Sequence, residues 1–259
     1  MREDGHRPAP GLVTFVGAGP GDPELLTIKG RKAIAGADLV LYAGSLVPPE
    51  VVACARPGAM VLDSAPLTLE ECHARVRETA LAGGLVARVH TGDPSLYGAL
   101  REQAALLDAD GIPWRVIPGG TAACAAAAAA GVSFSIPGVS QSLILCRTPG
   151  RTPVPECESL AALASHRTAM AVYLSAQAAG RMAEELGREL APETPVLCAQ
   201  RVGWPGERLV WTSLAALPAC VEENGFDRQT IFLILPGESG AGEARSCLYA
   251  PGFSHSWRR

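Results

Sequence analysis

The chain has 259 residues, enough for one large domain or for two of ordinary size with substantial cores. Aromatic residues make up 5% and the formal net charge is −4, which argues against a nucleic-acid-binding surface of interleaved basic and aromatic side chains. The longest small-apolar run, residues 122–132, is about half the ~20 residues that a membrane span needs, and the N-terminal residues carry no signal-peptide pattern, so a cytoplasmic protein is expected.

Short β-rich runs alternate with helical patterns in the first half of the chain. Strands are expected at residues 12–16, 38–42, 85–89 and 114–117. Between the second and third of these, Thr68 and Glu71 have the spacing of a capping box at the start of an amphipathic helix. This rhythm is typical of an open, largely parallel α/β sheet with helices on its faces.

The sequence PGGT at residues 118–121 interrupts this pattern, and a domain junction is expected there. The predicted organisation is an N-terminal α/β domain (11–118), a C-terminal α/β domain (119–237) and an irregular tail (238–259). The second domain has strand patterns at residues 142–146, 169–174, 195–199, 208–212 and 230–235. Because some of the last three lack long helices between them, this sheet is expected to be mixed.

The first glycine-rich loop, GAGPGDPELLT at residues 17–27, follows a predicted strand and resembles a phosphate-binding loop. It departs from the dinucleotide fingerprint, because Asp22 replaces the third glycine and no acidic residue follows the strand at 38–42. A Gly-Lys-Ser/Thr sequence is also missing from the chain. A carboxylate beside the loop disfavours an anionic ligand.

A second loop, HTGDPSLYG at residues 90–98, again leaves a strand through Gly-Asp-Pro. Asp22 and Asp93 therefore lie at strand ends, where open α/β sheets place their ligands, and together they favour a cationic ligand. S-adenosylmethionine fits, because it carries a sulfonium and an ammonium group and no phosphate. The alternative is that both segments are simply turns in which the aspartate caps the helix that follows.

These loops, in this order, resemble those of the tetrapyrrole methylase family over about residues 12–236. Within that family, YAGSLV (42–47), HTGDPSLYGALREQ (90–103) and GRTPVPE (150–156) are most similar to the methylases that act on carbon 11 of precorrin-4 in cobalamin biosynthesis. The resemblance implies two α/β domains with S-adenosylmethionine in a cleft between them, a tetrapyrrole substrate and a homodimer. Cobalt-precorrin-4 or another precorrin or uroporphyrinogen methylase stays open, and a nucleotide-binding oxidoreductase is a remote alternative.

The resemblance also implies site residues. The cofactor would contact Pro20, Thr91, Gly92, Asp93, Leu96, Thr121, Ala122, Leu174 and Val202. For the carboxylate-rich substrate the candidates are Arg147, Arg151 and Tyr97, with a solvated surface role as the alternative for each arginine and a half-buried helix position for the tyrosine.

Methyl transfer from a sulfonium to an electron-rich pyrrolic carbon does not require a strong base. The sequence agrees, since it shows no nucleophile elbow, no paired acid–base carboxylates and no metal-ligand spacing. His90 is a candidate general base, but the interpretation preferred here is that it orients its turn by hydrogen bonding. Gly120 departs from the family pattern, which has a branched residue at that position.

Overall fold

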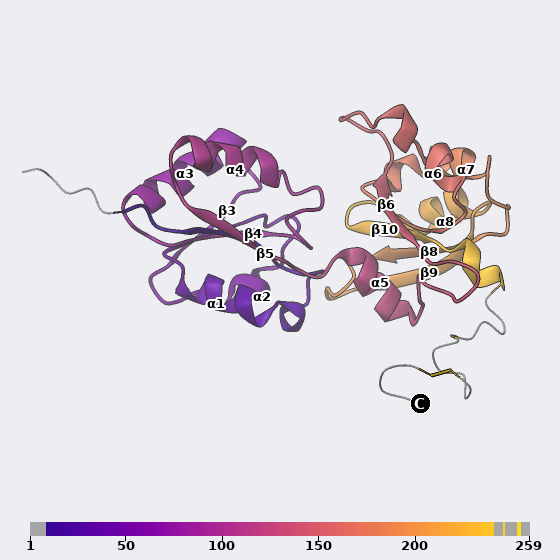
Figure 1. Cartoon of the computed structure of the whole chain (residues 1–259), viewed down its shortest axis with the longest axis horizontal. Coiled ribbons are helices and arrows are strands. Elements are labelled where there is room, and N and C mark those ends of the chain that lie inside the picture. The colour runs from indigo at the N-terminus through magenta and orange to yellow at the C-terminus, as the bar shows by residue number, and fades with distance from the viewer. Residues whose placement is uncertain (1–8, 241–245, 247–252, 255–259) are drawn as a thin grey trace, which may run out of the picture. The chain divides into compact units, whose positions relative to one another are not determined.

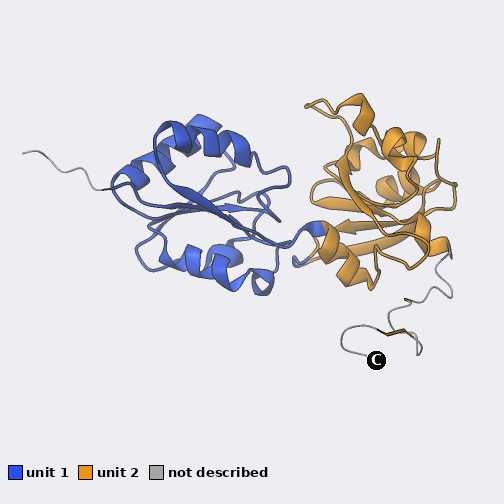
Figure 2. Cartoon of the chain, viewed as in Figure 1, with its two compact units in different colours: residues 1–122, 203–205 blue, residues 123–202, 206–259 orange. Residues whose placement is uncertain are grey.

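The computed structural model describes residues 9–240, 246 and 253–254, which fall into two compact units (Figure 2). Unit 1 runs to Ala122 and also includes Gly203–Pro205, whereas unit 2 comprises Ala123–Val202 and the chain from Gly206 onward. The predicted boundary between residues 118 and 119 stays a prediction. Most of the predicted tail, 238–259, lies outside the described residues, and its first three residues belong to a short 3-10 helix, η4 (Pro236–Gly240).

Unit 1 is built on a five-stranded parallel sheet (Figure 1). Its strands are β1 (Val13–Gly17), β2 (Leu39–Tyr42), β3 (Met60–Asp63), β4 (Val86–His90) and β5 (Trp114–Ile117). They lie in the order β3-β2-β4-β1-β5, and every neighbouring pair is parallel. All residues of β1 are buried, as expected of a central strand covered on both faces.

Helices cover both faces of this sheet (Figure 1). They are α1 (Ile28–Gly36) and α2 (Pro49–Val52) on one face, and α3 (Leu69–Leu81) and α4 (Leu100–Ala109) on the other. Successive side chains of β1 point to opposite faces of the sheet, so the unit has two core layers. Val16 packs in the layer under α1 and α2, and Phe15 packs in the layer under α3 and α4. The capping box of α3 is confirmed: the Glu71 amide donates to Thr68 Oγ1 (3.2 Å) and the Thr68 amide to Glu71 Oε2 (2.8 Å).

Unit 2 contains a mixed sheet, as predicted. Its strands are β6 (Leu143–Arg147), β7 (Ala169–Tyr173), β8 (Pro195–Gln200), β9 (Arg208–Ser213) and β10 (Thr230–Ile234). They lie in the order β6-β7-β10-β8-β9, where only β6 and β7 pair in parallel. The helices are α5 (Ala122–Ala130), α6 (Leu160–Ala164), α7 (Ala179–Leu186) and α8 (Leu217–Asn224), and the last three bury their apolar side chains in one core with the sheet.

The nine strands predicted from sequence are confirmed, each within one residue at either end. The sequence did not reveal β3, an edge strand whose Met60 side chain is 57% exposed. Within β3 only Leu62 is half-buried and packs against the core, so the strand shows no clear alternation and its place in the sheet depends mainly on backbone pairing with β2. Among the described residues, no helix combines the length and apolar character that a bilayer crossing requires.

Candidate active site

Three glycine-bearing loops meet at one edge of the unit 1 sheet. They are residues 17–22, 90–98 and 118–121, which follow β1, β4 and β5. Because β4 and β5 are the parallel neighbours of β1, the carboxyl ends of these strands share an edge. The first two loops pair directly: the Gly92 amide donates to the Gly19 carbonyl (2.8 Å) and the Gly19 amide to the Gly92 carbonyl (3.2 Å).

The loops pack so closely that two positions cannot carry a side chain. A Cβ placed on Gly119 would lie 2.1 Å from the carbonyl oxygen of Gly92, and one on Gly17 would lie 2.4 Å from the amide nitrogen of Gly119. These contacts are with backbone atoms of other loops, so no side chain can rotate away to relieve them. The glycines therefore serve the packing of loop on loop.

Asp93 ties the second loop to the third. Its carboxylate accepts from the Ser95 amide at Oδ1 (2.8 Å) and from the Gly119 amide at Oδ2 (3.0 Å). Partial burial opposes ionisation, but the hydrogen bonds from these amides outweigh it and hold the pKa of Asp93 below its usual value of 3.8. Asp93 thus brings a fixed negative charge to this edge and organises the backbone there.

Asp22 repeats the local turn of Asp93 without the contact between loops. Its Oδ1 accepts from the Glu24 amide (2.8 Å), which caps the 3-10 helix η1 (Pro23–Leu25). The capping interpretation is therefore confirmed for Asp22, and it is wrong for Asp93, because the helix that follows, α4, begins at Leu100 and has Ala99 as its N-cap. These turns leave each side chain a carboxylate, so the expectation of a cationic ligand stays a prediction for both.

Backbone borders an open space at this edge. A Cβ on Gly92 would meet only the Gly120 carbonyl, at 3.9 Å, and a Cβ on Gly120 only Pro20 Cδ, at 3.8 Å. A ligand can therefore approach the backbone closely there. The remaining cofactor candidates of unit 1 lie on the same loops or, for Ala122, at the first residue of α5: Thr91 is exposed, whereas Leu96, Thr121 and Ala122 are half-buried.

Tyr97 lies in a strained turn between the second loop and α4. The φ of Tyr97 is +56° and that of Ala99 is +49°. Tyr97 is 48% exposed. Left-handed backbone at non-glycine residues costs about 1–3 kcal/mol and is concentrated at functional sites. The substrate contact expected of Tyr97 stays a prediction, to which strain and exposure add support.

In unit 2 the corresponding candidates also share one edge. β6 and β7 are parallel and β10 is antiparallel to both β7 and β8, so β6, β7 and β8 all end at the same side. Leu174, directly after β7, has a φ of +53° and is 72% exposed. Val202, after β8, is buried and follows Arg201, which also has a φ of +53°.

Two hydroxyl groups fix the turn that carries Leu174. The buried Ser175 Oγ donates to the Tyr173 carbonyl (2.6 Å), and it accepts from the Thr148 amide and the Thr148 hydroxyl (both 2.9 Å). The ends of β6 and β7 are therefore tied together beneath an exposed leucine. An exposed apolar side chain on strained backbone fits the ligand contact predicted for Leu174.

The structure gives Arg147 a local role. Its guanidinium donates to the carbonyls of Thr148 (3.2 Å), Thr152 (3.1 Å) and Pro153 (2.8 Å), which folds the loop after β6 around it. Arg151 lies exposed in that loop. A carboxylate contact stays a prediction for both arginines, and the observed contacts favour Arg151 as the more available cation.

His90 is a buried residue at the end of β4. Burial, together with the nearby Arg88 charge, lowers its pKa to about 3, so its imidazole is neutral at physiological pH. Nε2 has no hydrogen-bond partner among the described residues, and the ring lies 5.8 Å from the ring of Phe15. The expectation that its side chain orients the turn by hydrogen bonding is wrong at Nε2; its backbone carbonyl does so instead, by accepting from the Ala18 amide (2.8 Å).

Replacing His90 with phenylalanine is expected to flatten the pH dependence of stability. A histidine with a usual pKa of 6.5 takes up a proton on unfolding whenever the pH lies between that value and the folded value of about 3. The wild-type free energy of unfolding should therefore fall by about 2 kcal/mol between pH 7 and pH 5 from this residue. Denaturant unfolding of His90→Phe should lack that part of the decrease, with the exposed His166→Gln as control; an unchanged pH dependence would contradict the assignment.

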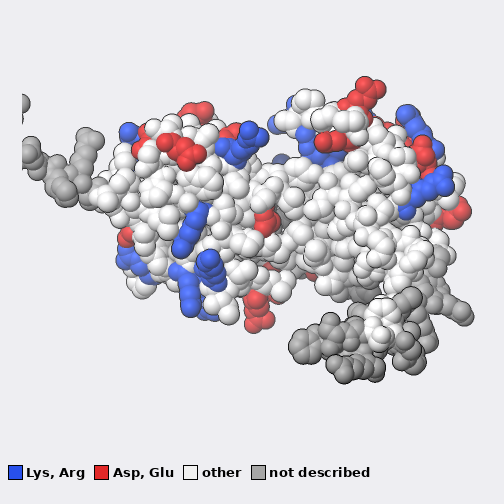
Figure 3. All heavy atoms as spheres, in the orientation of Figure 1, with Lys and Arg blue, Asp and Glu red and all other residues white. Residues whose placement is uncertain are grey.

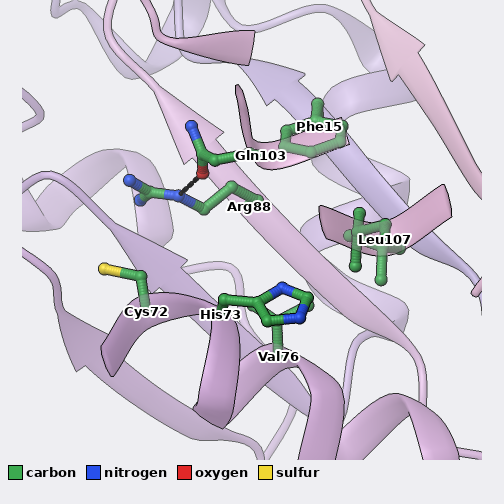
Figure 4. Close-up of a pocket in the computed structure, with 8 residues that line it drawn as sticks. Phe15, Cys72, His73, Val76, Arg88, Gln103 and Leu107 are labelled. Carbon is green, nitrogen blue, oxygen red and sulfur yellow. Dashed lines mark hydrogen bonds between the residues drawn. The ribbon is translucent and has the colours of Figure 1, made fainter. Parts of the chain in front are cut away.

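A small cavity lies away from the loops, between the sheet of unit 1 and helices α3 and α4 (Figure 4). Arg88 Nε donates to Gln103 Oε1 (2.9 Å) at its wall. The cavity measures about 10 Å³, room for one water, so it is no candidate for the cofactor. It is lined by Val13, Phe15, Cys72, His73, Val76, Arg88, Gln103 and Leu107.

Charged groups of both signs are interspersed over the visible face (Figure 3). Lys29, Arg31 and Lys32 are exposed on α1, as expected of a solvated helix face.

Sequence reasoning missed two other groups next to the candidate site: Ser175 and Trp204. Ser175 contacts Thr148 and Trp204 contacts Pro20, both distant in the chain. The one sequence signal is Gly-Trp-Pro at 203–205, which is typical of a turn around Trp204.

Comparison with known proteins places the chain among enzymes of tetrapyrrole synthesis. Residues 12–218 match the family described as Tetrapyrrole (Corrin/Porphyrin) Methylases. The chain is 41% identical to cobalt-precorrin-4 C(11)-methyltransferase of Priestia megaterium over 95% of this chain and 96% of the relative. It is 40% identical to precorrin-4 C(11)-methyltransferase of Pseudomonas aeruginosa, over 95% of this chain and 98% of that one.

Comparison with solved structures indicates the same family. A cobalt precorrin-4 methyltransferase, titled a cobalamin biosynthetic enzyme, has a TM-score of 0.84 at 41% identity and covers 86% of this chain and 94% of its own. Uroporphyrin-III C-methyltransferase from Thermus thermophilus, complexed with S-adenyl homocysteine, has a TM-score of 0.72 at 27% identity, covering 87% and 92%. The expected α/β fold is confirmed by these neighbours. The chain belongs to the tetrapyrrole (corrin/porphyrin) methylase family.

Proposed function

We propose that the protein is an S-adenosylmethionine-dependent methyltransferase that acts on ring carbon 11 of precorrin-4 in cobalamin biosynthesis. The observation that carries the proposal is the similarity, at 40–41% identity over 95% of the chain, to two enzymes named C(11)-methyltransferases. The three-loop edge of unit 1 supports it, because backbone and two carboxylates there suit a cationic donor. Family membership overturns the remote alternative of a nucleotide-binding oxidoreductase.

In this proposal the cofactor is held mainly by backbone. Pro20 and Gly92 border the open space of unit 1, Gly120 has room there for a larger side chain, and Asp93 keeps two of the loops together. Leu174 and Val202 are the proposed contacts from unit 2. A related structure with S-adenyl homocysteine bound supports the choice of ligand.

S-adenosylmethionine, when bound, supplies a methyl group on a positively charged sulfur. The residues of this chain contribute position: interlocked loop backbones hold the donor in one orientation, and such positioning is worth up to ~7–11 kcal/mol of a reaction barrier. His90 is unsuited to removing the proton from the substrate, because its neutral ring has a pKa of about 3 and is buried. No side chain described above is therefore assigned the removal of that proton.

The metal state of the substrate is an open part of the proposal, since one relative is named for the cobalt form and the other for the metal-free form, at nearly equal identity. The decisive assay incubates the protein with S-adenosylmethionine carrying a ¹³C methyl group and with either precorrin-4 or cobalt-precorrin-4. We expect one added methyl, assigned to carbon 11 by carbon NMR, in one of the two arms. A methyl on another ring carbon, or no transfer in either arm, would refute the proposal.

Substrate recognition is proposed to use cations despite the net charge of −4. Arg151→Ala is expected to weaken precorrin binding about tenfold, the effect of one charge-assisted hydrogen bond, with unchanged affinity for S-adenosylhomocysteine. Arg188→Ala, another exposed arginine, is the control. Equal binding by the two variants in a fluorescence titration would remove Arg151 from the site.

A homodimer and a cytoplasmic location complete the proposal. The homodimer is implied by the family resemblance and the cytoplasmic location is the expectation from the sequence, and neither depends on a contact described above. Sedimentation of the purified protein would test the dimer, which predicts twice the chain mass of 26.8 kDa.

A further inference from the structure

Residues Gly203–Pro205 form part of unit 1 although the chain on both sides belongs to unit 2. Their contact within unit 1 is with the first glycine-rich loop. Trp204 Nε1 donates to the Pro20 carbonyl (3.1 Å), across 184 positions of sequence. The indole therefore reaches the residue predicted to line the cofactor site.

The indole also packs closely against the loop backbone. A Cβ on Gly21 would lie 2.2 Å from both Cδ1 and Nε1 of Trp204, so only glycine leaves room for the ring. On the other side of the contact, a Cβ on Gly203 would lie 3.0 Å from the Asp22 amide nitrogen, and Gly203 has a φ of +77°. Glycines on both segments thus permit one close approach.

This contact fixes a segment that would otherwise be mobile by composition. Gly19 and Gly21 have φ values of +75° and +147°, and glycine has the largest backbone freedom to lose on ordering. A tryptophan side chain has only two torsions and offers a broad rigid surface, so it orders a neighbouring backbone at low entropic cost. A loop ordered in advance binds its ligand more tightly, because less ordering remains to be done on binding.

We propose that Trp204 is a positioning residue that holds the Pro20 turn in its ligand-binding conformation, and that its indole senses occupation of that turn. The proposal rests on the proposed cofactor site and adds a residue that the family resemblance did not supply. Trp204 touches the loop at the Pro20 carbonyl and at Gly21, so it acts through the loop and is not assigned a contact with the methyl donor.

The test uses the full chain and S-adenosylhomocysteine as the probe. Trp204→Phe keeps an aromatic ring but removes the N–H donor, and Trp204→Ala removes both. Trp211→Phe, on the exposed side of β9, is the matched control. Calorimetry is expected to show affinity about fivefold weaker for Trp204→Phe, the effect of one hydrogen bond, and weaker again for Trp204→Ala. Trp204 is only half-buried, so folding should persist, which circular dichroism checks.

Tryptophan emission supplies a readout that a purely structural role would not change. The wild type and Trp211→Phe should change emission on adding S-adenosylhomocysteine, whereas Trp204→Phe should not. Wild-type affinity in both Trp204 variants, or a ligand-induced emission change that persists in Trp204→Phe, would overturn the proposal while leaving the cofactor site intact. Absence of binding by the wild type would instead overturn the cofactor site.

Discussion

Gly119→Ala is expected to abolish measurable binding of S-adenosylhomocysteine, a loss of at least about 100-fold, and to lower the free energy of unfolding by about 3 kcal/mol. The new methyl group would lie 2.1 Å from the Gly92 carbonyl oxygen and 2.8 Å from Gly17 Cα. Both atoms are backbone, so the second and third loops must separate. That separation also breaks the hydrogen bond from the Gly119 amide to Asp93.

The neighbouring residue provides the control for this prediction. A Cβ on Gly120 would meet only Pro20 Cδ, at 3.8 Å, an ordinary contact. Gly120→Ala should therefore change stability by less than about 0.5 kcal/mol. It should also bind S-adenosylhomocysteine within about threefold of wild type, because the family pattern has a branched residue at this position. Calorimetry and urea unfolding of both variants make the comparison; equal effects at the two positions would show that loop interlock does not govern the site.

The second large effect is expected at Asp93. In Asp93→Asn one carboxylate oxygen becomes an NH₂ group that cannot accept from the Ser95 or the Gly119 amide. One charge-assisted hydrogen bond is lost, and the new NH₂ group faces a backbone N–H that also needs an acceptor. Together these effects should lower the free energy of unfolding by about 2 kcal/mol. Affinity for S-adenosylhomocysteine should fall at least about tenfold, because the third loop loses its anchor and the edge loses a negative charge.

Asp22→Asn separates the cap from the charge. Asp22 accepts only from the Glu24 amide among the described hydrogen bonds, and an asparagine oxygen can accept in the same way. The affinity of Asp22→Asn for S-adenosylhomocysteine should fall by about threefold at most. If Asp22→Asn and Asp93→Asn lost affinity equally, the charge of the two turns would matter and the bridge to Gly119 would not.

Acid pH gives an independent check on Asp93. Its folded pKa lies below the usual 3.8, so the stabilisation is complete above that value and disappears as the pH falls through the folded pKa. The stability difference between wild type and Asp93→Asn should therefore be constant from pH 7 to about pH 5 and decrease only below pH 4. Urea unfolding across this range measures it, and a difference that changed near neutrality would contradict the assignment.

Much of the fold was predictable because the informative signals are local. The strand runs are short, apolar and bounded by turn residues, and the capping box of α3 spans three residues. β3 was not predicted, because an edge strand with mostly exposed side chains shows no clear burial pattern. The mixed order of the second sheet was predicted only in kind, since the pairing of β10 between β7 and β8 depends on long-range contacts.

The candidate site was predictable in outline for the same reason. Gly-Asp-Pro sequences after strands mark Asp22 and Asp93 as turn residues at a sheet edge. What the sequence could not supply is which residue each one reaches. The bridge from Asp93 to Gly119 and the bond from Trp204 to Pro20 join residues 26 and 184 positions apart, and no periodicity encodes such contacts.

The central claim is that the three-loop edge receives S-adenosylmethionine, and therefore also its product S-adenosylhomocysteine, and not a dinucleotide. Calorimetric titration of the purified full chain with S-adenosylhomocysteine and, separately, with NADH tests it most directly. We predict saturable heat with the first ligand, strongly reduced in Gly119→Ala and retained in Gly120→Ala, and none with the second. Binding of NADH, or no heat with S-adenosylhomocysteine, would contradict the account.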